Sequence, residues 1–168
     1  MAESSVTTEN GWALYAHPFF IARLSELIGR VKALIKKDPE NFHRHPDYDL
    51  YESVSDYIRH HVPANPSHKD FRQGSTLGKS HRHWFRVKKG LPSRYRLFFQ
   101  FRSEAPKTIL YAWFNDERTI RKEGDKNDVY AVFAAMLKSK KMPDSFEDLR
   151  AACKGISESG DLAETKED

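Results

Sequence analysis

The residues best suited to chemistry lie in a run of cations interleaved with aromatic side chains, from Lys69 to Arg102. It contains ten lysines and arginines and a single carboxylate, Asp70. The 168-residue chain has 28 basic and 24 acidic residues, so the remainder, with 18 and 23, is net acidic. Clustered cations bind phosphates and can neutralise charge that develops on a transferring phosphoryl group. The run therefore predicts a surface for a phosphate-backbone partner, with aromatic rings available for bases or for a core.

Side-chain alternation sorts the residues of two expected strands, 84–88 and 94–102, between the two faces of a sheet. Burial of the apolar set, which includes Val87, Leu97 and Phe99, leaves cations on the other face. Four cations on neighbouring strands repel one another unless an anion lies among them. An ordinary solvated basic face is the alternative. The cations on this face are Arg86, Lys88, Arg94 and Arg96.

Cleavage of a phosphodiester also needs groups that move protons. The loop after the expected strand 108–115 should bring Glu117 and Arg121 close to the four cations. Tyr130 should lie in the first turn of the last main helix, at the same rim, although a core aromatic is an equally good interpretation. Further contacts to RNA are expected from Lys79, Arg82, His83, Lys89 and Lys126.

Paired histidines at 43/45, 60/61 and 81/83 raise the question of a metal. No paired cysteines accompany them, and a His-x-His sequence in a charged loop is usually solvated. Asp116 and Glu117 adjoin, but no second acidic pair is evident. We therefore expect no metal and no cofactor, with His81 and His83 contacting phosphate or ribosomal RNA instead.

Composition indicates a soluble globular protein, with 39% hydrophobic and 31% charged residues. The apolar runs are too short to cross a bilayer, and the first ten residues lack the features of a signal peptide. A single cysteine, Cys153, cannot form an internal disulfide. These features predict a cytoplasmic protein without membrane contact.

The hydrophobic pattern predicts an α+β fold. A strand at 11–16 precedes helices at 18–37 and 47–61, three strands follow as an antiparallel meander, and helices at 127–139 and 146–153 end the fold. The central strand, 109–114, is apolar on both faces and should be covered on both sides. We expect a flexible N-terminus (1–10), one domain (11–153) and an acidic disordered tail (154–168).

Several blocks in a fixed order carry a family resemblance: NGWALYAHP (10–18), KDPENF (37–42), FRQGSTLG (71–78), WFRVK (84–88), RYRLFF (94–99) and WFNDE (113–117). Spaced residues extend it, namely Arg121, Gly124, Lys126, Asp128 and Tyr130. The chain resembles the YhaV family of bacterial type II toxins, within the RelE-like ribonuclease superfamily. The resemblance implies a RelE-like antiparallel-rich sheet packed with N-terminal helices and a C-terminal helix.

The resemblance also implies a toxin that cleaves mRNA in association with the ribosome and thereby inhibits translation and growth. It implies an antitoxin of the PrlF, swapped-hairpin type, through which alone the protein would bind operator DNA. The basic strand residues of RelE-like toxins fall here on Arg86 and Lys88, and the arginine of their Tyr-Arg-Leu strand falls on Arg96. Arg118 or Arg121 could supply the arginine after the next strand, and Tyr130 the tyrosine near the last helix.

These residues support a metal-independent mechanism in which the RNA 2′-OH is the nucleophile. The base would be Lys88 or Glu117. Arg96, with Arg86 and Arg94, would stabilise the phosphate oxygens, and Tyr130, Arg121 or Lys126 would assist the leaving group. A non-catalytic RNA- or ribosome-binding module is the alternative. A DNA-binding regulator ranks last, because no helix carries the cation cluster of a recognition helix.

Overall fold

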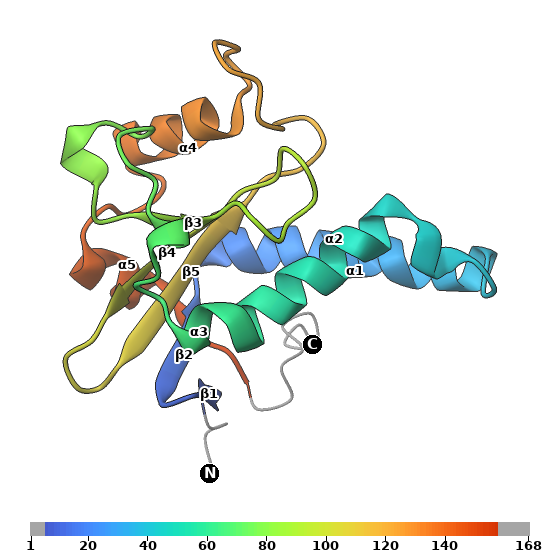
Figure 1. Cartoon of the computed structure of the whole chain (residues 1–168), viewed down its shortest axis with the longest axis horizontal. Helices are drawn as coiled ribbons and strands as arrows, with labels where there is room; N and C mark the ends of the chain where they lie inside the picture. Colours follow the sequence, from blue (N-terminus) through green and yellow to red (C-terminus); the bar gives the residue numbers. More distant parts are fainter. Residues whose placement is uncertain (1–5, 158–168) are drawn as a thin grey trace.

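The computed structural model describes residues 6–157 as a six-stranded sheet enclosed by helices (Figure 1). The strand order is β1-β2-β5-β4-β3, and β6 pairs with the free part of β2. Only β2 and β5 pair in parallel; the other pairs are antiparallel. The strands are β1 (Thr8–Glu9), β2 (Trp12–Ala16), β3 (Phe85–Val87), β4 (Leu97–Arg102), β5 (Thr108–Phe114) and β6 (Lys154–Gly155). The expected α+β class and the β3-β4-β5 meander are confirmed.

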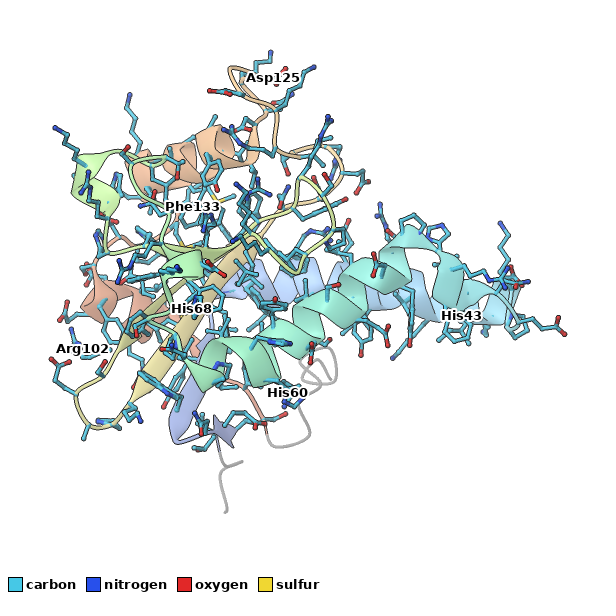
Figure 2. The ribbon with its side chains drawn as sticks, in the orientation of Figure 1. His43, His60, His68, Arg102, Asp125 and Phe133 are labelled. Atoms are coloured by element: carbon cyan, nitrogen blue, oxygen red, sulfur yellow. The ribbon has the colours of Figure 1, made fainter. Side chains whose placement is uncertain are left out.

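Helices lie on both faces of this sheet. In Figure 1, α1 and α2 form an arm that projects beyond the sheet, and α4 lies on the other side of the strands. His43, at the turn of this arm, and Asp125, at the tip of the loop before α4, mark two extremes of the molecule in Figure 2. The helices are α1 (Pro18–Lys37), η1 (Phe42–Arg44), α2 (Pro46–Asp56), η2 (Tyr57–His61), α3 (Val62–Ala64), η3 (Lys69–Phe71), η4 (Lys79–His81), α4 (Val129–Lys138) and α5 (Phe146–Ala152).

The two helical layers enclose two hydrophobic cores. One core joins the inner faces of α1 and α2 to the sheet through residues such as Phe20, Leu27 and Phe99. The other joins α4 and α5 to the opposite face through Phe98, Phe133 and their neighbours. Every residue of β5 is buried, as its apolar sequence predicted, because this strand is covered on both sides.

Local sequence explains why the longest helix begins and ends where predicted. Pro18 occupies the first turn of α1, where its missing N–H costs little, and the His17 ring accepts a hydrogen bond from the Phe19 N–H at 2.9 Å. Two lysines in the last turn complement the helix dipole. These end signals explain why the predicted and the observed helix have the same bounds.

Three boundaries differ from the predictions by three residues or more. β4 starts at Leu97 instead of residue 94, because Arg94 has φ +73°, which is incompatible with a strand. The second helix continues without a break through η2 and α3, with Pro63 in its last turn. The disordered tail was expected from residue 154, yet Lys154–Gly155 pairs with β2 and Ile156 is buried in the core; residues 158–168 lie outside the described part.

The predicted flexible N-terminus likewise contains an ordered segment. Thr8–Glu9 forms β1 against β2, and the Thr7 N–H donates to the carbonyl of Ile156 at 2.7 Å. The two ends of the described chain therefore meet beside β2. Within residues 6–157, no helix is both long and apolar enough to cross a bilayer.

Candidate active site

Tyr130 occupies the position predicted for it, in the first turn of α4, where its side chain faces the sheet. The Asp128 carboxylate caps this helix by accepting a hydrogen bond from the Tyr130 N–H at 3.0 Å. The Tyr130 ring packs edge-on against Phe98 of β4, with 5.7 Å between ring centroids. Capping and ring packing together fix where the phenolic oxygen lies.

Two arginines converge on that oxygen. Arg86 Nε, from β3, and Arg96 Nε, from the residue before β4, each lie 3.1 Å from Tyr130 Oη. Each guanidinium also donates to a backbone carbonyl, Arg86 to Asp70 at 2.7 Å and Arg96 to Tyr95 at 2.9 Å. The two side chains are therefore held in fixed orientations about one hydroxyl.

A third arginine covers the tyrosine ring from the loop before α4. The Arg121 guanidinium lies 5.0 Å from the ring centroid, and its Nη1 donates to Asp128 Oδ1 at 2.8 Å. We call Arg86, Arg96, Arg121 and Tyr130 the tyrosine–arginine cluster. The Asp128 carboxylate pairs with Arg121 of this cluster. The three guanidinium groups therefore carry three positive charges beside one negative charge. Such an excess of fixed positive charge suits an anion, and phosphate oxygens match the geometry of guanidinium groups.

Asp128 does more than cap the helix. Its Oδ1 also accepts a hydrogen bond from the Lys122 N–H at 2.5 Å. Burial acts to raise the pKa of this carboxyl, but the hydrogen bonds from Arg121 and from two backbone N–H groups outweigh it and lower the pKa below its ordinary 3.8. The charged carboxylate therefore holds the loop and Arg121 against the start of α4.

Asn115 is a positioning residue that the sequence did not reveal. It is fully buried after β5, and its Oδ1 accepts a hydrogen bond from the Arg96 N–H at 2.9 Å. Its Nδ2 donates to the carbonyls of Arg94 and Thr119, and its own carbonyl accepts from Arg23 Nε at 3.0 Å. Arg23, Arg94 and Arg96 lie 92, 21 and 19 residues away from it in sequence, so no local pattern marked its role.

The structure corrects the expectation that four cations lie together on one open face of the sheet. Helix α4 and the segment before α5 cover that face of the sheet, so Arg96 is 8% exposed and Gln100 is 2% exposed. Arg94 lies outside β4; its side chain is exposed, and its carbonyl accepts from Arg121 N at 2.9 Å. Lys88 is exposed and follows the last paired residue of β3, Val87, which pairs with Leu97. Continuing this register by one residue places Lys88 opposite Arg96. Of the four cations, Arg86 and Arg96 meet at Tyr130.

Glu117 lies elsewhere than expected. It forms two hydrogen bonds with Arg30 of α1, at 2.9 and 3.3 Å, and α1 packs on the face of the sheet opposite to α4. The hydrogen bonds from Arg30 hold the pKa of Glu117 below its ordinary value. An ion-paired carboxylate of low pKa is a weak base, so the geometry does not favour the role considered for it.

The five residues predicted to contact RNA are all exposed, and two of them also have Asp70 or Asp144 as a partner. Arg82 lines a pocket with Arg72 and Phe85. Lys89 Nζ lies 3.4 Å from Asp70 Oδ1, whereas His83 is hydrogen-bonded to Asp144. The basic pocket combines guanidinium groups with an aromatic ring, which is a combination that binds nucleotides.

Comparisons with known proteins identify the family of this chain. Residues 14–154 match a family model for YhaV toxins, described as a toxin with endonuclease activity of a toxin–antitoxin system. A protein named Toxin YhaV from Escherichia coli O6:H1 is 46% identical over 141 residues, which are 83% of this chain and 90% of that protein. Ribonuclease toxin YhaV of Escherichia coli K12 is 45% identical with the same coverage. No solved structure shows a significant similarity. The chain therefore belongs to the YhaV family of toxin–antitoxin endonucleases.

Proposed function

We propose that this toxin is a metal-independent endoribonuclease that cleaves mRNA, in association with the ribosome, and so inhibits translation and growth. The observation that supports it best is the convergence of Arg86 Nε and Arg96 Nε on Tyr130 Oη, each at 3.1 Å. The family is endonucleolytic, and one relative is named a ribonuclease toxin. Fixed guanidinium groups beside a hydroxyl offer charge stabilisation and proton transfer at one place.

In the proposed reaction, the RNA 2′-oxygen attacks the adjacent phosphorus and the bond to the 5′-oxygen breaks. Lys88, on the exposed edge beside Arg96, would accept the 2′ proton. Arg86 and Arg96 would stabilise the negative charge on the phosphate oxygens. Tyr130 would donate a proton to the departing 5′-oxygen, with Arg121 and Lys126 next in order for that role. The products are a 2′,3′-cyclic phosphate and a 5′-OH.

The same surface supports a proposal about the antitoxin. The exposed cations Arg94 and Lys122 adjoin the cluster through backbone hydrogen bonds to Arg121 and Asp128, and the chain has a net charge of +4. A PrlF-type swapped-hairpin antitoxin would inhibit by covering this basic surface with acidic groups, in competition with RNA. Operator DNA would then be bound through the antitoxin, as the family resemblance implies.

The low exposure of two cluster residues supports a second candidate function. Arg96 and Tyr130 are 8% and 6% exposed, so their network could serve only to hold the fold. The protein would then be a non-catalytic module that binds RNA or the ribosome through its exposed cations. Such a module would tolerate changes in the tyrosine–arginine cluster that leave the fold intact.

Cleavage of a defined mRNA by the purified chain, with and without translating ribosomes, tests the proposal. The assay contains EDTA and compares wild type with Arg96→Gln and with Arg44→Gln, a control at an exposed arginine on the α1–α2 arm. We expect EDTA-resistant cutting that falls at least about 10²-fold in Arg96→Gln, the scale for loss of one charge-stabilising donor, and no change in Arg44→Gln. Intact RNA binding without any cutting would favour the binding module.

A further inference from the structure

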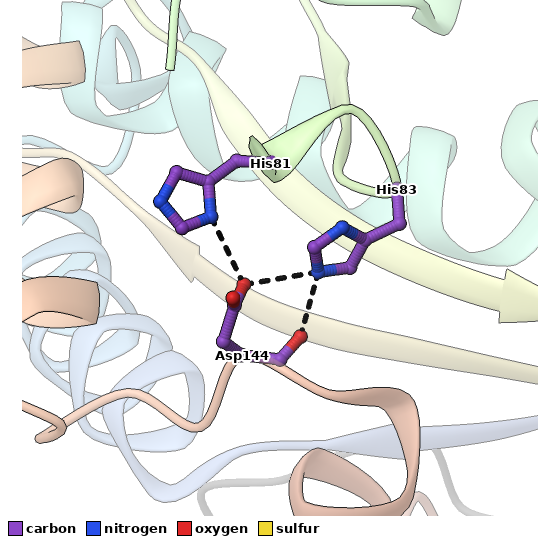
Figure 3. Close-up of side chains that lie close together, drawn as sticks. All are labelled: His81, His83 and Asp144. Carbon is purple, nitrogen blue, oxygen red and sulfur yellow. Dashed lines mark hydrogen bonds and ion pairs between the residues drawn. The ribbon is translucent and has the colours of Figure 1, made fainter. Parts of the chain in front are cut away.

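Figure 3 shows three side chains that could ligate a metal ion and that do not belong to the tyrosine–arginine cluster. His81 and His83 come from the segment at η4, and Asp144 comes from the turn before α5. One potential ligand atom from each residue lies within 4.8 Å of the other two. No other three histidine, cysteine or acidic side chains meet this criterion in residues 6–157.

Two buried donors hold Asp144, one through its carboxylate and one through its backbone carbonyl. Trp84 is fully buried, and its Nε1 donates to Asp144 Oδ1 at 2.8 Å. Gln100 is 2% exposed, and its Nε2 donates to the Asp144 carbonyl at 2.9 Å. Metal-binding carboxylates are commonly oriented by such outer donors. Asp144 is therefore positioned by the core, before any ligand arrives.

Both imidazoles point at the same oxygen. His81 Nδ1 lies 3.2 Å and His83 Nε2 lies 2.9 Å from Asp144 Oδ1 (Figure 3). The second carboxylate oxygen, Oδ2, takes part in none of the contacts with Trp84, His81 or His83. Ligands at about 2.0–2.1 Å from a tetrahedral zinc ion are about 3.3 Å apart. The two nitrogen–oxygen distances are close to that value, so small side-chain rotations would admit an ion.

The surroundings leave coordination positions open to solvent. The side chains of His81, His83 and Asp144 are 24%, 41% and 42% exposed. Two imidazoles and one carboxylate suit borderline divalent ions such as Zn²⁺, whereas Mg²⁺ and Ca²⁺ prefer oxygen ligands alone. Water would complete the coordination.

We propose that His81, His83 and Asp144 form a site for a divalent transition-metal ion of the zinc class. The ion would join the η4 segment, which carries Lys79 and Arg82, to the start of α5. The tyrosine–arginine cluster contributes no ligand to this ion. The role of the ion would therefore be structural, namely to stabilise the junction between η4 and α5. This inference does not rest on the proposed function. RNA cleavage in EDTA is compatible with the metal site, because hydrogen bonds to Asp144 hold the junction without metal.

The other His-x-His pair in the chain provides an internal contrast. His45 Nδ1 is occupied as a helix cap, since it accepts a hydrogen bond from the Asp47 N–H at 3.1 Å. His43 lies exposed at the end of the α1–α2 arm. The spacing is the same at both pairs, but only His81 and His83 meet a carboxylate held by the core. The third ligand, 61 residues after His83, explains why the sequence predicted no metal.

Calorimetric titration of the full, tag-free chain with ZnCl₂ tests the site. We compare wild type with His83→Ala, Asp144→Asn and His43→Ala, and repeat the titration with MgCl₂. The Asp144→Asn variant keeps an oxygen for Trp84, and its circular dichroism shows whether the fold is intact. CoCl₂ provides a second readout, because visible absorption reports a tetrahedral site.

We expect one Zn²⁺ per chain in wild type and in His43→Ala, and at least about tenfold weaker binding in His83→Ala and Asp144→Asn, a loss no smaller than that for an outer-shell partner. We also expect a Co²⁺ spectrum of tetrahedral type and no comparable binding of Mg²⁺. Absence of stoichiometric Zn²⁺ binding by wild type, or undiminished affinity in the folded His83→Ala and Asp144→Asn variants, would overturn the proposal.

Discussion

Replacement of Tyr130 by phenylalanine probes the tyrosine–arginine cluster most selectively. The ring that packs on Phe98 and under Arg121 remains, and only the oxygen shared by two Nε–H groups is lost. Arg86 is partly exposed, so water can replace its lost acceptor, whereas Arg96 is 8% exposed and cannot be solvated so easily. A buried donor left without a partner costs about 1–3 kcal/mol.

We therefore expect Tyr130→Phe to lower the free energy of unfolding by about 2 kcal/mol. At about 2–4 °C per kcal/mol for a chain of this size, the thermal midpoint should fall by about 4–8 °C. Cleavage of a defined mRNA, measured well below that midpoint, should fall about 10²-fold or more, because proton transfer to the leaving group is lost and the arginines are released.

Thermal unfolding and cleavage are measured side by side with Tyr51→Phe. The Tyr51 hydroxyl makes no hydrogen bond to the described residues, so this control should change neither quantity appreciably. A Tyr130→Phe protein that is less stable yet cuts at the wild-type rate would refute the catalytic reasoning. One that is unchanged in both respects would refute the energetic reasoning as well.

Three further predictions concern the neighbouring residues. The lowered pKa of Asp128 means that its charge stabilises the fold above the ordinary pKa of 3.8, and that this contribution is lost as the pH falls through the lower folded-state value. The stability difference between wild type and Asp128→Asn, measured by urea unfolding, should therefore shrink from pH 6 to pH 3; a constant difference would contradict this. Lys88→Ala should reduce mRNA cleavage at least about 10²-fold, as expected for loss of a general base, without lowering the thermal midpoint, whereas Lys36→Ala, at an exposed lysine of α1, should cut normally; equal rates for both variants would remove Lys88 from the mechanism. Glu117→Gln should cut at the wild-type rate and change stability by no more than about 1 kcal/mol, as for other exposed ion pairs, while a large loss of rate would restore Glu117 as the base.

Local sequence signals predicted much of the fold. The end signals of α1 and the apolar run 109–114 of β5 each depend on neighbours in sequence, and each was predictable. Strand alternation correctly separated the two faces of β4. What the alternation could not show is that a second helical layer covers the face with Arg96, because that depends on where α4 packs.

Some residues of the candidate site were likewise predictable from local sequence, and others depend on contacts between distant segments. Arg86, Arg96, Arg121 and Tyr130 were candidates by residue type, and the structure brings them together. Glu117 was a reasonable candidate by proximity in sequence, but its partner Arg30 lies 87 residues away. Asn115 and Asp144 act through hydrogen bonds to distant segments, so no local pattern marked them.

The central claim is that the RNA 2′-OH is the nucleophile at the tyrosine–arginine cluster. A single 2′-deoxy substitution in a defined mRNA, on the ribose 5′ of a mapped cleavage site, tests it most directly when the reaction contains EDTA. The account predicts that cutting at that phosphate disappears while other sites are cut at their usual rates. Continued cutting at the substituted position, at the rate seen with the all-ribose RNA, would contradict it.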